Sequence, residues 1–365
     1  MVYRAIGIMS GSSLDGLDIA MVEFHENSGK WGFEVKQASC YPYTDEWREK
    51  LKSAINLNAF DYLLLHTEFG HYVGSEINRF IESNQLEFQV QLISSHGHTT
   101  FHSPDKKMTG QLGDGAAIAA QTGINVVSDL RAMDIALGGQ GAPIVPIGEK
   151  LLWPDYQYLL NLGGIANLSL NTEGGYIAFD VCPANRVLDM LAQTMGKLYD
   201  EDGSLAAGGK INLSLLDQLN NLPYYSQHYP KSLANDFGTD TVYPLIVKSG
   251  CSIPDALATY TEHIALQIKW NIESRTIRDS NGASKLLVTG GGAHNGFLIS
   301  RLKHLLAGST IDMEVPTAGL INFKEAIVMA LIGVLRWREE NNVLASVTGA
   351  SRDSIGGAVW IGQQY

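Results

Sequence analysis

Residues 7–18 read GIMSGSSLDGLD, and this stretch decides the fold. Strands are expected at 2–8, which runs into this stretch, and at 18–24, which leads out of it. The glycine- and serine-rich turn at 9–16 between them predicts a hairpin. A third strand is expected at 31–38. The chain therefore opens with a strand, a glycine-rich turn and two further strands.

The same order returns near the middle of the chain. A strand expected at 158–162 is followed by the turn 163–167, GGIAN, and by strands at 168–170 and 176–179. Two units of this kind, with little sequence in common, indicate a duplicated α/β fold. We expect each half to contribute one glycine-rich hairpin to a shared ligand cleft.

Length and composition fit two domains. The chain has 365 residues, of which 45% are hydrophobic and 18% charged, and 38 of them are glycine. A typical domain size of roughly 100–200 residues predicts two domains. We place the first at 1–126 together with 340–365, and the second at 127–339.

Charge and hydropathy exclude several functions. Lys and Arg number 26 against 38 Asp and Glu, so a net charge of −12 provides no field for nucleic acid or an anionic membrane. The longest apolar run, 326–335, is too short to span a membrane, and the N-terminus lacks the apolar length of a signal peptide. Cys40, Cys182 and Cys251 form no disulfide framework. We therefore expect a cytoplasmic protein that binds neither nucleic acid nor membrane.

Common nucleotide-binding and hydrolase motifs are missing from the sequence: there is no P-loop, no dinucleotide fingerprint and no nucleophile elbow. The two glycine-rich hairpins offer another way to hold phosphate, because backbone N–H groups approach it closely where side chains are small. The first cradle comprises Gly11, Ser12, Ser13 and Gly16, and the second comprises Gly163, Gly164 and Asn167. Ordinary hairpin turns are the alternative interpretation.

Carboxylates beside the first hairpin are candidates for holding a metal. Asp15 or Asp18 is suited to hold Mg²⁺ through water, since hard cations take oxygen ligands. The run Gly290-Gly291-Gly292 follows a strand expected at 285–288 and suits a nucleoside lying against bare backbone. A tight strand-to-helix connection explains the same glycines equally well.

Asp180 ends the third strand of the second unit, where a carboxylate is suited to act as a general base; a capping or turn aspartate is the alternative.

His96, His98 and Thr99 follow an apolar strand expected at 88–93. They fit a polar ligand-contacting loop better than a zinc site, because no cysteine or carboxylate nearby in sequence completes the ligand set.

Arg131 and Asp134 belong to a loop at 129–146. If they face a cleft, they would bind a carboxylate and sugar hydroxyls. A surface ion pair is the alternative.

These residues closely resemble the anhydro-N-acetylmuramic acid kinase family. Its pattern G-x-M-S-G-T-S-x-D-G-x-D is similar to 7–18, and the resemblance continues in order through the whole chain. The further matching blocks are 95–99, 129–143, 161–167, 179–180, 289–295, 324–326 and 348–350. Seven further blocks in the same order make the resemblance to this family highly specific.

The resemblance implies a two-domain actin/hexokinase-like (ribonuclease H-like) fold with a duplicated core, and ATP with Mg²⁺ in an interdomain cleft. It implies that ATP phosphorylates O6 of 1,6-anhydro-N-acetylmuramic acid while water opens the ring at C1, giving N-acetylmuramic acid 6-phosphate in cell-wall recycling. A glycosidase usually needs a second carboxyl group to protonate the departing oxygen. Here the γ-phosphoryl group can capture that oxygen, so one base suffices.

The resemblance also implies roles for individual residues. Asp180 matches the base that activates water, Glu325 is a candidate for orienting the sugar or Mg²⁺, with helix capping as the alternative, and Arg131 is a candidate for the lactyl carboxylate. The ATP-binding set is Gly11, Ser12, Ser13, Leu14, Asp15, Gly16, Leu17, Asp18, Gly163, Gly164, Asn167, Gly290, Gly291, Gly292 and Asn295. The substrate set is His96, His98, Thr99, Arg131 and Asn185. A homodimer is compatible with the resemblance.

Three departures from the family pattern affect these expectations. The usual T-G-P-G-N after the catalytic aspartate is VCPAN at 181–185, which loses two glycines and a hydroxyl. The usual glutamine of S-H-G-Q-T is His98, a titratable group, and Ser12 replaces a threonine. The alternatives are therefore a kinase for another amino sugar, a non-catalytic ATP-binding regulator and, more remotely, a zinc hydrolase built on the histidines.

Overall fold

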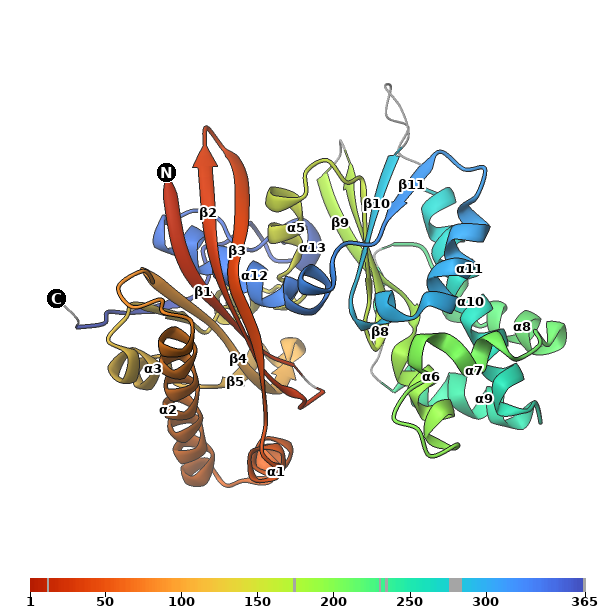
Figure 1. Cartoon of the computed structure of the whole chain (residues 1–365), viewed down its shortest axis with the longest axis horizontal. Helices are drawn as coiled ribbons and strands as arrows, with labels where there is room; N and C mark the ends of the chain where they lie inside the picture. The colour runs from red at the N-terminus through yellow and green to blue at the C-terminus, as the bar shows by residue number, and fades with distance from the viewer. Residues whose placement is uncertain (12, 173–174, 230, 234–235, 276–283, 364–365) are drawn as a thin grey trace. The chain divides into compact units, whose positions relative to one another are not determined.

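The structure is a computed structural model that describes residues 1–11, 13–172, 175–229, 231–233, 236–275 and 284–363. Its contacts divide the chain into two compact units. The first comprises Met1–Pro154 and Phe323–Tyr365, and the second comprises Asp155–Asn322. Each unit has a sheet of its own (Figure 1). Each also has its own hydrophobic core.

The sheet of the first unit has the strand order β12-β6-β4-β1-β2-β3, and β5 pairs with β4. Strands β1, β2 and β3 form an antiparallel meander, whereas β4 runs parallel to β1 and β6 runs parallel to β4. The strands are β1 Val2–Ser10, β2 Gly16–Asn27, β3 Lys30–Pro42, β4 Leu92–Ser103, β5 Met108–Leu112, β6 Val126–Ser128 and β12 Ala358–Trp360.

Helices cover both faces of this sheet. Successive side chains of β1 point to opposite faces: Ile6 and Ile8 pack with Phe69 of α2 in the core, whereas Gly7 lies against Ala326 of α12. The helices of this unit are α1 Asp45–Ser53, α2 Ala59–Ser83, α3 Gly115–Thr122, α4 Ala132–Ala136, α5 Pro146–Leu152, α12 Ala318–Trp337, which begins in the second unit, and α13 Ala345–Thr348, with short 3₁₀ turns at Ala54–Asn56 and Pro104–Lys106.

The sheet of the second unit has the order β11-β10-β7-β8-β9. Strands β7, β8 and β9 again form an antiparallel meander, and β10 and β11 run parallel to β7. The strands are β7 Tyr158–Leu162, β8 Ile165–Thr172, β9 Gly175–Pro183, β10 Ser284–Thr289 and β11 Ile311–Glu314. Its order β11-β10-β7-β8-β9 repeats the order β6-β4-β1-β2-β3 of the first sheet, which has β12 and β5 in addition. This repeat confirms the duplicated α/β fold predicted from the hairpins.

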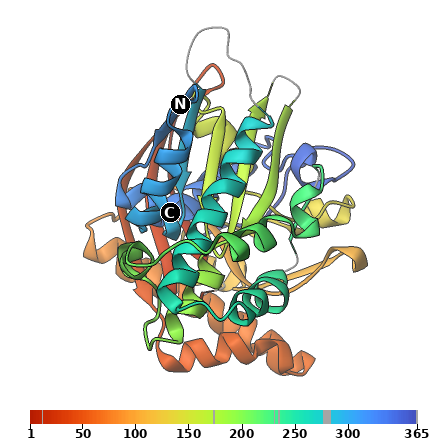
Figure 2. The same cartoon turned by 90° about the vertical axis from the view of Figure 1, so that its right-hand side faces the viewer.

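Helix α10, Ile253–Glu273, packs against β9 and α11 in the second unit (Figure 2). It begins at Ile253 because the Ser252 hydroxyl accepts a hydrogen bond from the N–H of Asp255 and Pro254 occupies the first turn. The other helices are α6 Asn185–Gln193, α7 Ser204–Ala207, α8 Leu213–Asn220, α9 Tyr243–Lys248 and α11 Gly296–Leu306, with shorter helical turns at Glu201–Gly203, Pro223–Ser226, Phe237–Val242 and Gly291–His294.

The unit boundaries differ from the predicted ones: residues 127–154 and 323–339 lie in the first unit. β6 belongs to the first sheet, and the Trp153 ring meets the edge of Phe33 of β3 with 5.4 Å between centroids. A buried ion pair joins Lys324 of α12 to Glu149 of α5. Local sequence could not show which sheet these segments join, because the pairing is with strands far away in the chain.

β4 also differs from its prediction. The strand starts at Leu92 and continues to Ser103, so 95–99 lies within a strand and not in a loop after it. The reason is β5, which turns back and pairs antiparallel with the second half of β4.

Helix α12 has the length and apolar composition of a membrane span, and it is the one such helix in the described parts of the chain. Of its most apolar window, 67% is buried inside the protein. Gly7 is in contact with it, and an added Cβ at Gly7 would lie 1.8 Å from the carbonyl oxygen of Ala326. A helix covered in this way is a core element of the first unit.

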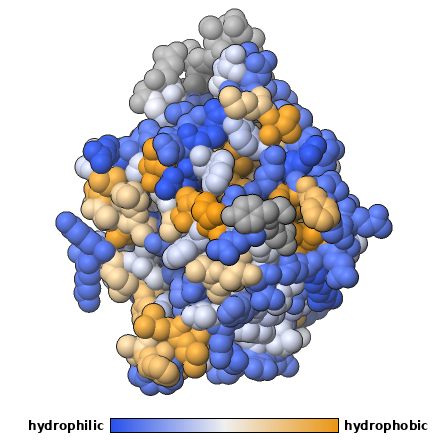
Figure 3. All heavy atoms as spheres, turned by 90° about the vertical axis from the view of Figure 1, so that its left-hand side faces the viewer, coloured by the Kyte–Doolittle hydropathy of each residue, from blue (hydrophilic) through white to orange (hydrophobic). Residues whose placement is uncertain are grey.

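Helix α2 is exposed along the side that turns away from the sheet. Phe60, Leu63 and Leu64 are exposed there, whereas Leu65 and Phe69 are buried. Figure 3 shows the face of the molecule on this side, where apolar areas lie among polar ones.

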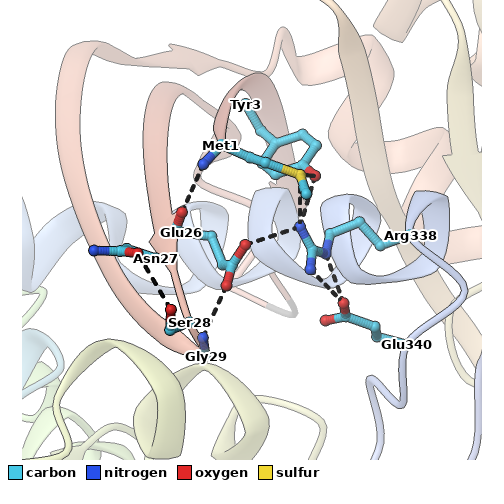
Figure 4. Close-up of polar contacts among 8 residues, drawn as sticks. All are labelled: Met1, Tyr3, Glu26, Asn27, Ser28, Gly29, Arg338 and Glu340. Carbon is cyan, nitrogen blue, oxygen red and sulfur yellow. Dashed lines mark hydrogen bonds and ion pairs between the residues drawn. The ribbon is translucent and has the colours of Figure 1, made fainter.

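A polar cluster ties the N-terminus to the segment that follows α12 (Figure 4). The Arg338 guanidinium lies 3.3 Å from a carboxylate oxygen of Glu26 and 2.5 Å from one of Glu340, and it donates a hydrogen bond to the Tyr3 hydroxyl at 2.6 Å. The Met1 ammonium donates to the carbonyl of Glu26. These contacts hold the start of β1 and the end of β2 to the segment after α12.

Candidate active site

The β1–β2 hairpin turns through Gly11, Ser13, Leu14 and Asp15, while Ser12 lies outside the described residues. Leu14 has a left-handed backbone with φ +59°, and its N–H donates to the carbonyl of Gly11. Ser13 and Asp15 are exposed, so main-chain and hydroxyl groups of this turn are open to a ligand. The predicted residue Leu17, by contrast, buries its side chain in the core of the first unit and offers a ligand only backbone groups.

Three carboxylates, those of Asp15, Asp18 and Glu325, lie close enough together to interact. Burial raises the pKa of Asp18 to about 6; a hydrogen bond from the Cys40 thiol lowers it, and the charges of Glu325 and Asp15 raise it further. Glu325 lies inside α12 and is exposed, which excludes the alternative of a helix cap. A divalent cation would relieve the repulsion among such oxygens.

These carboxylates do not form a closed metal cage. In the described ranges no group of three or more His, Cys, Asp or Glu side chains is arranged to hold a metal ion directly. The geometry therefore fits a Mg²⁺ ion held largely through water and phosphate oxygens, as Mg²⁺ prefers beside one or two carboxylates.

Arg131 is held in place by two hydrogen bonds. Its Nε donates to Nε2 of His96 at 2.8 Å, and a terminal nitrogen donates to the carbonyl of Gly141 at 2.5 Å. Burial lowers the pKa of Arg131 to about 10, so the guanidinium stays charged at neutral pH. A guanidinium has five N–H donors, and two bonds leave donors for an anionic ligand.

His96 is buried, and both of its ring nitrogens have partners. Nε2 accepts from Arg131, so Nδ1 carries the proton and donates it to the carbonyl of Gly97 at 2.8 Å. Burial lowers the pKa of His96 to about 3, and the Arg131 charge lowers it further. His96 is thus a neutral residue that positions Arg131.

His98 is buried beside the first hairpin. The Tyr43 hydroxyl donates to Ser10 Oγ at 2.7 Å, and Ser10 Oγ lies 3.0 Å from Nδ1 of His98. Because Ser10 Oγ accepts the hydrogen bond from Tyr43, the Ser10 hydroxyl can donate its own proton to Nδ1 of His98. Burial lowers the pKa of His98. Thr99 is exposed and its hydroxyl accepts a hydrogen bond from Gln111. The structure thus joins His98 to the glycine-rich hairpin.

Asp134 is buried and fully engaged by the first unit itself. Its carboxylate accepts hydrogen bonds from the N–H of Gly141 and the Thr348 hydroxyl, both at 2.7 Å. Asp134 therefore closes the loop after α4 and is not free for sugar hydroxyls. The matching blocks at 129–143 and 348–350 meet in this contact.

In the second unit, Asp180 has a partner on each carboxylate oxygen. Asn167 of β8, directly opposite in the sheet, donates to Oδ1. The N–H of Leu233 donates to Oδ2 at 2.8 Å, and the Tyr224 hydroxyl donates to the Asp180 carbonyl. Burial raises the pKa of Asp180 although both hydrogen bonds lower it. A fixed, partly buried carboxylate of this kind is suited to take up a proton.

The glycines of this unit lie around the end of β7. The carbonyls of Gly164 and Gly163 accept hydrogen bonds from the N–H groups of Ala184 and Asn185, which fixes the β7–β8 turn against the start of α6. The Asn185 side chain donates to the carbonyl of Leu162 at 3.0 Å. The predicted phosphate and substrate residues Gly163, Gly164 and Asn185 are thus brought together.

The glycine run at 290–292 is close-packed. An added Cβ at Gly290, which has φ +81°, would lie 2.4 Å from Asn161 Oδ1, and one at Gly292 would lie 2.8 Å from Asn185 Oδ1. Gly291 is exposed and leaves its backbone open. Asn295 caps α11, where its Oδ1 accepts from the N–H of Leu298 at 3.0 Å.

Sequence reasoning missed Leu233 and Tyr224 as partners of Asp180. A backbone N–H carries no signature in the sequence, and the tyrosine lies in a short 3₁₀ turn with no motif around it. Sequence reasoning also missed the chain of contacts from Tyr43 through Ser10 to His98, because the three residues lie far apart in the sequence.

Two sheets of one ribonuclease H-like topology, each with a glycine-rich hairpin between its first two strands, define the actin/hexokinase-like class of ATP-using proteins. The model of the family described as "Anhydro-N-acetylmuramic acid kinase" matches residues 3–362. The chain therefore belongs to the anhydro-N-acetylmuramic acid kinase family, a family of ATP-dependent sugar kinases.

Individual relatives agree over nearly the whole length. The chain is 34% identical over 373 residues to an anhydro-N-acetylmuramic acid kinase of Hydrogenovibrio crunogenus, covering 97% of each chain. It is 33% identical over 361 residues to one of Vibrio parahaemolyticus, covering 95% of each. Among solved structures, component A of the (R)-2-hydroxyglutaryl-CoA dehydratase of Acidaminococcus fermentans is 14% identical with a TM-score of 0.45, over 91% of this chain and 97% of that one.

Proposed function

We propose that this chain phosphorylates O6 of 1,6-anhydro-N-acetylmuramic acid with ATP and opens the anhydro bridge with water, giving N-acetylmuramic acid 6-phosphate. The observation that carries this proposal is the setting of Asp180. Asn167 and Leu233 fix its two oxygens, and burial raises its pKa, which favours uptake of a proton.

The proposed reaction needs one base. Asp180 takes a proton from a water molecule, whose oxygen forms a bond to C1 of the sugar. The C1–O6 bond breaks, O6 forms a bond to the γ-phosphorus, and the bond between that phosphorus and the ADP oxygen breaks. Asp180 then returns its proton to solvent. Because phosphorus captures the departing oxygen, no second carboxyl group has to protonate it.

The first unit would bind the charged parts of the reactants. Backbone and hydroxyl groups of Gly11 and Ser13 suit the phosphates, and Arg131 suits the lactyl carboxylate. Asp15, Asp18 and Glu325 would hold Mg²⁺ through its water shell. When bound, Mg²⁺ neutralises charge on the transferred phosphoryl group.

The altered segment 181–185 supports this substrate over another amino sugar. Val181, Cys182 and Ala184 bury their side chains in the core of the second unit, and the Pro183 carbonyl accepts a hydrogen bond from the Tyr260 hydroxyl at 2.8 Å. The departures from the family pattern thus lie where they alter packing, and Asn185 is retained.

The decisive experiment uses Mg-ATP, 1,6-anhydro-N-acetylmuramic acid and ¹⁸O-labelled water. Mass spectrometry should find N-acetylmuramic acid 6-phosphate with one labelled oxygen. Asp180→Asn should reduce turnover roughly 10²–10⁴-fold, the usual contribution of a general base, while ATP binding is retained. ATP binding without turnover in the unaltered chain would favour a regulator, and turnover only of a sugar without the bridge would favour another amino-sugar kinase.

We also propose a cytoplasmic location and a homodimeric assembly. The structure leaves Cys40, Cys182 and Cys251 as free thiols, which suits a reducing compartment. Light scattering of the purified chain tests the assembly: the mass of a dimer is expected, and the mass of a monomer would contradict it.

A further inference from the structure

A cavity of about 320 Å³ lies entirely within the first unit. It is open to solvent on one side and is bordered by the first half of α2, the β4–β5 hairpin, the start of α3, the end of β6 and β12. None of the carboxylates assigned above to the reaction or to Mg²⁺ lines it. Its volume is at the lower end of the range of small-molecule sites, roughly 300–1,000 Å³. We call it the α2 pocket.

The α2 pocket presents polar groups of known direction. His66 Nδ1 accepts a hydrogen bond from the N–H of Gly113 at 3.1 Å, so in the neutral ring Nε2 carries the proton and is a donor. Asp129 offers an exposed carboxylate as an acceptor. Its backbone has φ +57°, an uncommon conformation for a residue other than glycine that gathers at functional sites.

Two buried polar atoms in the wall have no hydrogen-bond partner in the described chain. They are Ser95 Oγ and Gln111 Oε1, both on residues that line the pocket. Such atoms are rare in folded proteins, and each calls for a physical explanation. They show that the protein itself does not fully satisfy the polar groups of this wall.

Aromatic rings form another part of the lining. The Trp360 Nε1–H donates to Ser128 Oγ at 3.1 Å, which fixes the plane of the indole, and Tyr62 is held by a hydrogen bond between its hydroxyl and Thr100 at 2.6 Å. Rigid aromatic surface beside a few oriented polar groups is typical of small-ligand sites.

The charges of the lining select against anions. Asp114 and Asp129 line the pocket, whereas no Lys or Arg does. The Asp114 carboxylate accepts a hydrogen bond from the N–H of Ala116 at the start of α3. A carboxylated or phosphorylated ligand would meet the negative charge of the exposed Asp129 there. We propose that the α2 pocket binds a neutral monosaccharide, whose hydroxyls meet Asp129 and His66 and whose apolar face lies on Trp360.

This pocket is connected to Arg131 through one side chain. His96 lines the pocket, and its Nε2 accepts the hydrogen bond from Arg131. A sugar in the pocket that shifts His96 therefore shifts the guanidinium proposed to hold the lactyl carboxylate. Occupancy of the pocket changes the KM for the sugar substrate more than kcat.

The test titrates N-acetylglucosamine into the full chain without nucleotide and follows binding by calorimetry and ligand-observed NMR. Saturable binding is expected, at least tenfold weaker in Asp129→Asn and in Trp360→Ala. Asn tolerates a positive φ well, so the first variant changes charge without adding strain. Asp105→Asn and Trp337→Ala, outside the pocket, are the matched controls and should bind as the unaltered chain does.

Further arms separate this site from the reaction site. Binding should persist in Asp180→Asn and in the presence of saturating 1,6-anhydro-N-acetylmuramic acid, so the result does not depend on the proposed function. Displacement by that substrate, undiminished affinity in both pocket variants, or no binding at all would each overturn the proposal. Stronger binding of glucosamine, a cation, than of the neutral sugar would identify an amine site and overturn it equally, and glucuronate should not bind.

Discussion

Nε of Arg131 lies 2.8 Å from Nε2 of His96, and the direction of this hydrogen bond determines what both residues can do. An arginine nitrogen can only donate, so His96 must accept at Nε2 and remain neutral. A buried neutral imidazole thus holds a buried guanidinium in position without adding a second positive charge. The pair explains why the histidine belongs to the site without being a proton carrier.

Acid should destabilise the fold through His96. Its pKa is about 3 in the folded chain against 6.5 for an unperturbed histidine, so between these values the unfolded state binds more protons. Stability therefore falls as pH decreases below about 6.5, by up to ~1.4 kcal/mol per pH unit for one such group. Denaturant unfolding at pH 7 and pH 5 should show a smaller loss for His96→Gln than for the unaltered chain. His71→Gln, at an exposed position, should leave the loss unchanged; an equal effect of the two variants would contradict this account.

Asn167 should lower the pKa of Asp180, the proposed base. Its hydrogen bond lowers the pKa of Asp180, while burial raises it. Removing the donor in Asn167→Ala should raise that pKa further, so activity is lost at a higher pH on the acidic side of the pH profile. The measurement is kcat/KM against pH, with Asn171→Ala on the same strand as the control. An acidic limb that stays in place in Asn167→Ala would argue against Asp180 as the base.

Asp18 should govern the requirement for Mg²⁺. Its pKa of about 6 means that it is largely ionised at pH 7.5 and increasingly protonated below pH 6. We expect Asp18→Asn to raise the Mg²⁺ concentration for half-maximal turnover several-fold, since one charged oxygen near the metal is lost. Glu34→Gln, an exposed change on β3, serves as the control. Chelation of Mg²⁺ should abolish turnover in all three proteins, and an unchanged Mg²⁺ requirement in Asp18→Asn would remove this residue from the metal site.

Gly7 should tolerate no side chain. A Cβ there would lie 1.8 Å from the carbonyl oxygen of Ala326, so Gly7→Ala forces α12 away from the first sheet. Overpacking of this kind typically costs ~1–3 kcal/mol and occasionally more. Thermal or denaturant unfolding measures the loss. Gly32→Ala, where an added Cβ meets nothing within 4 Å, should change stability little; similar effects at both positions would contradict the close contact.

Local sequence patterns were sufficient to predict both hairpins. Alternating apolar residues on either side of GIMSGSSLDGLD and GGIAN define strands and turns over a few residues, and these signals act regardless of the rest of the chain. Ser252 and Pro254 mark a helix start for the same reason, since a cap involves only neighbours in sequence.

The contacts that fix the site escaped the sequence because their partners are distant. The N–H that holds Asp180 belongs to Leu233, and any residue other than proline would supply one. The unit boundaries moved because β6 and α12 join the first sheet through pairing and packing with segments far away in the chain. No pattern within 127–154 contains that information.

The sequence alone determined that two glycine-rich hairpins recur in a duplicated α/β fold, that the motifs are those of a sugar kinase family, and that Asp180 ends a strand. Those features follow from residue type and spacing. The tertiary structure alone decided that His96 is neutral and that Asn167 faces Asp180. It also decided that Gly141 and Thr348 occupy the Asp134 carboxylate, and that His96 lines a cavity of about 320 Å³. Each of these depends on register and on the stacking of sheets and helices, which place side chains from remote parts of the chain within hydrogen-bonding distance.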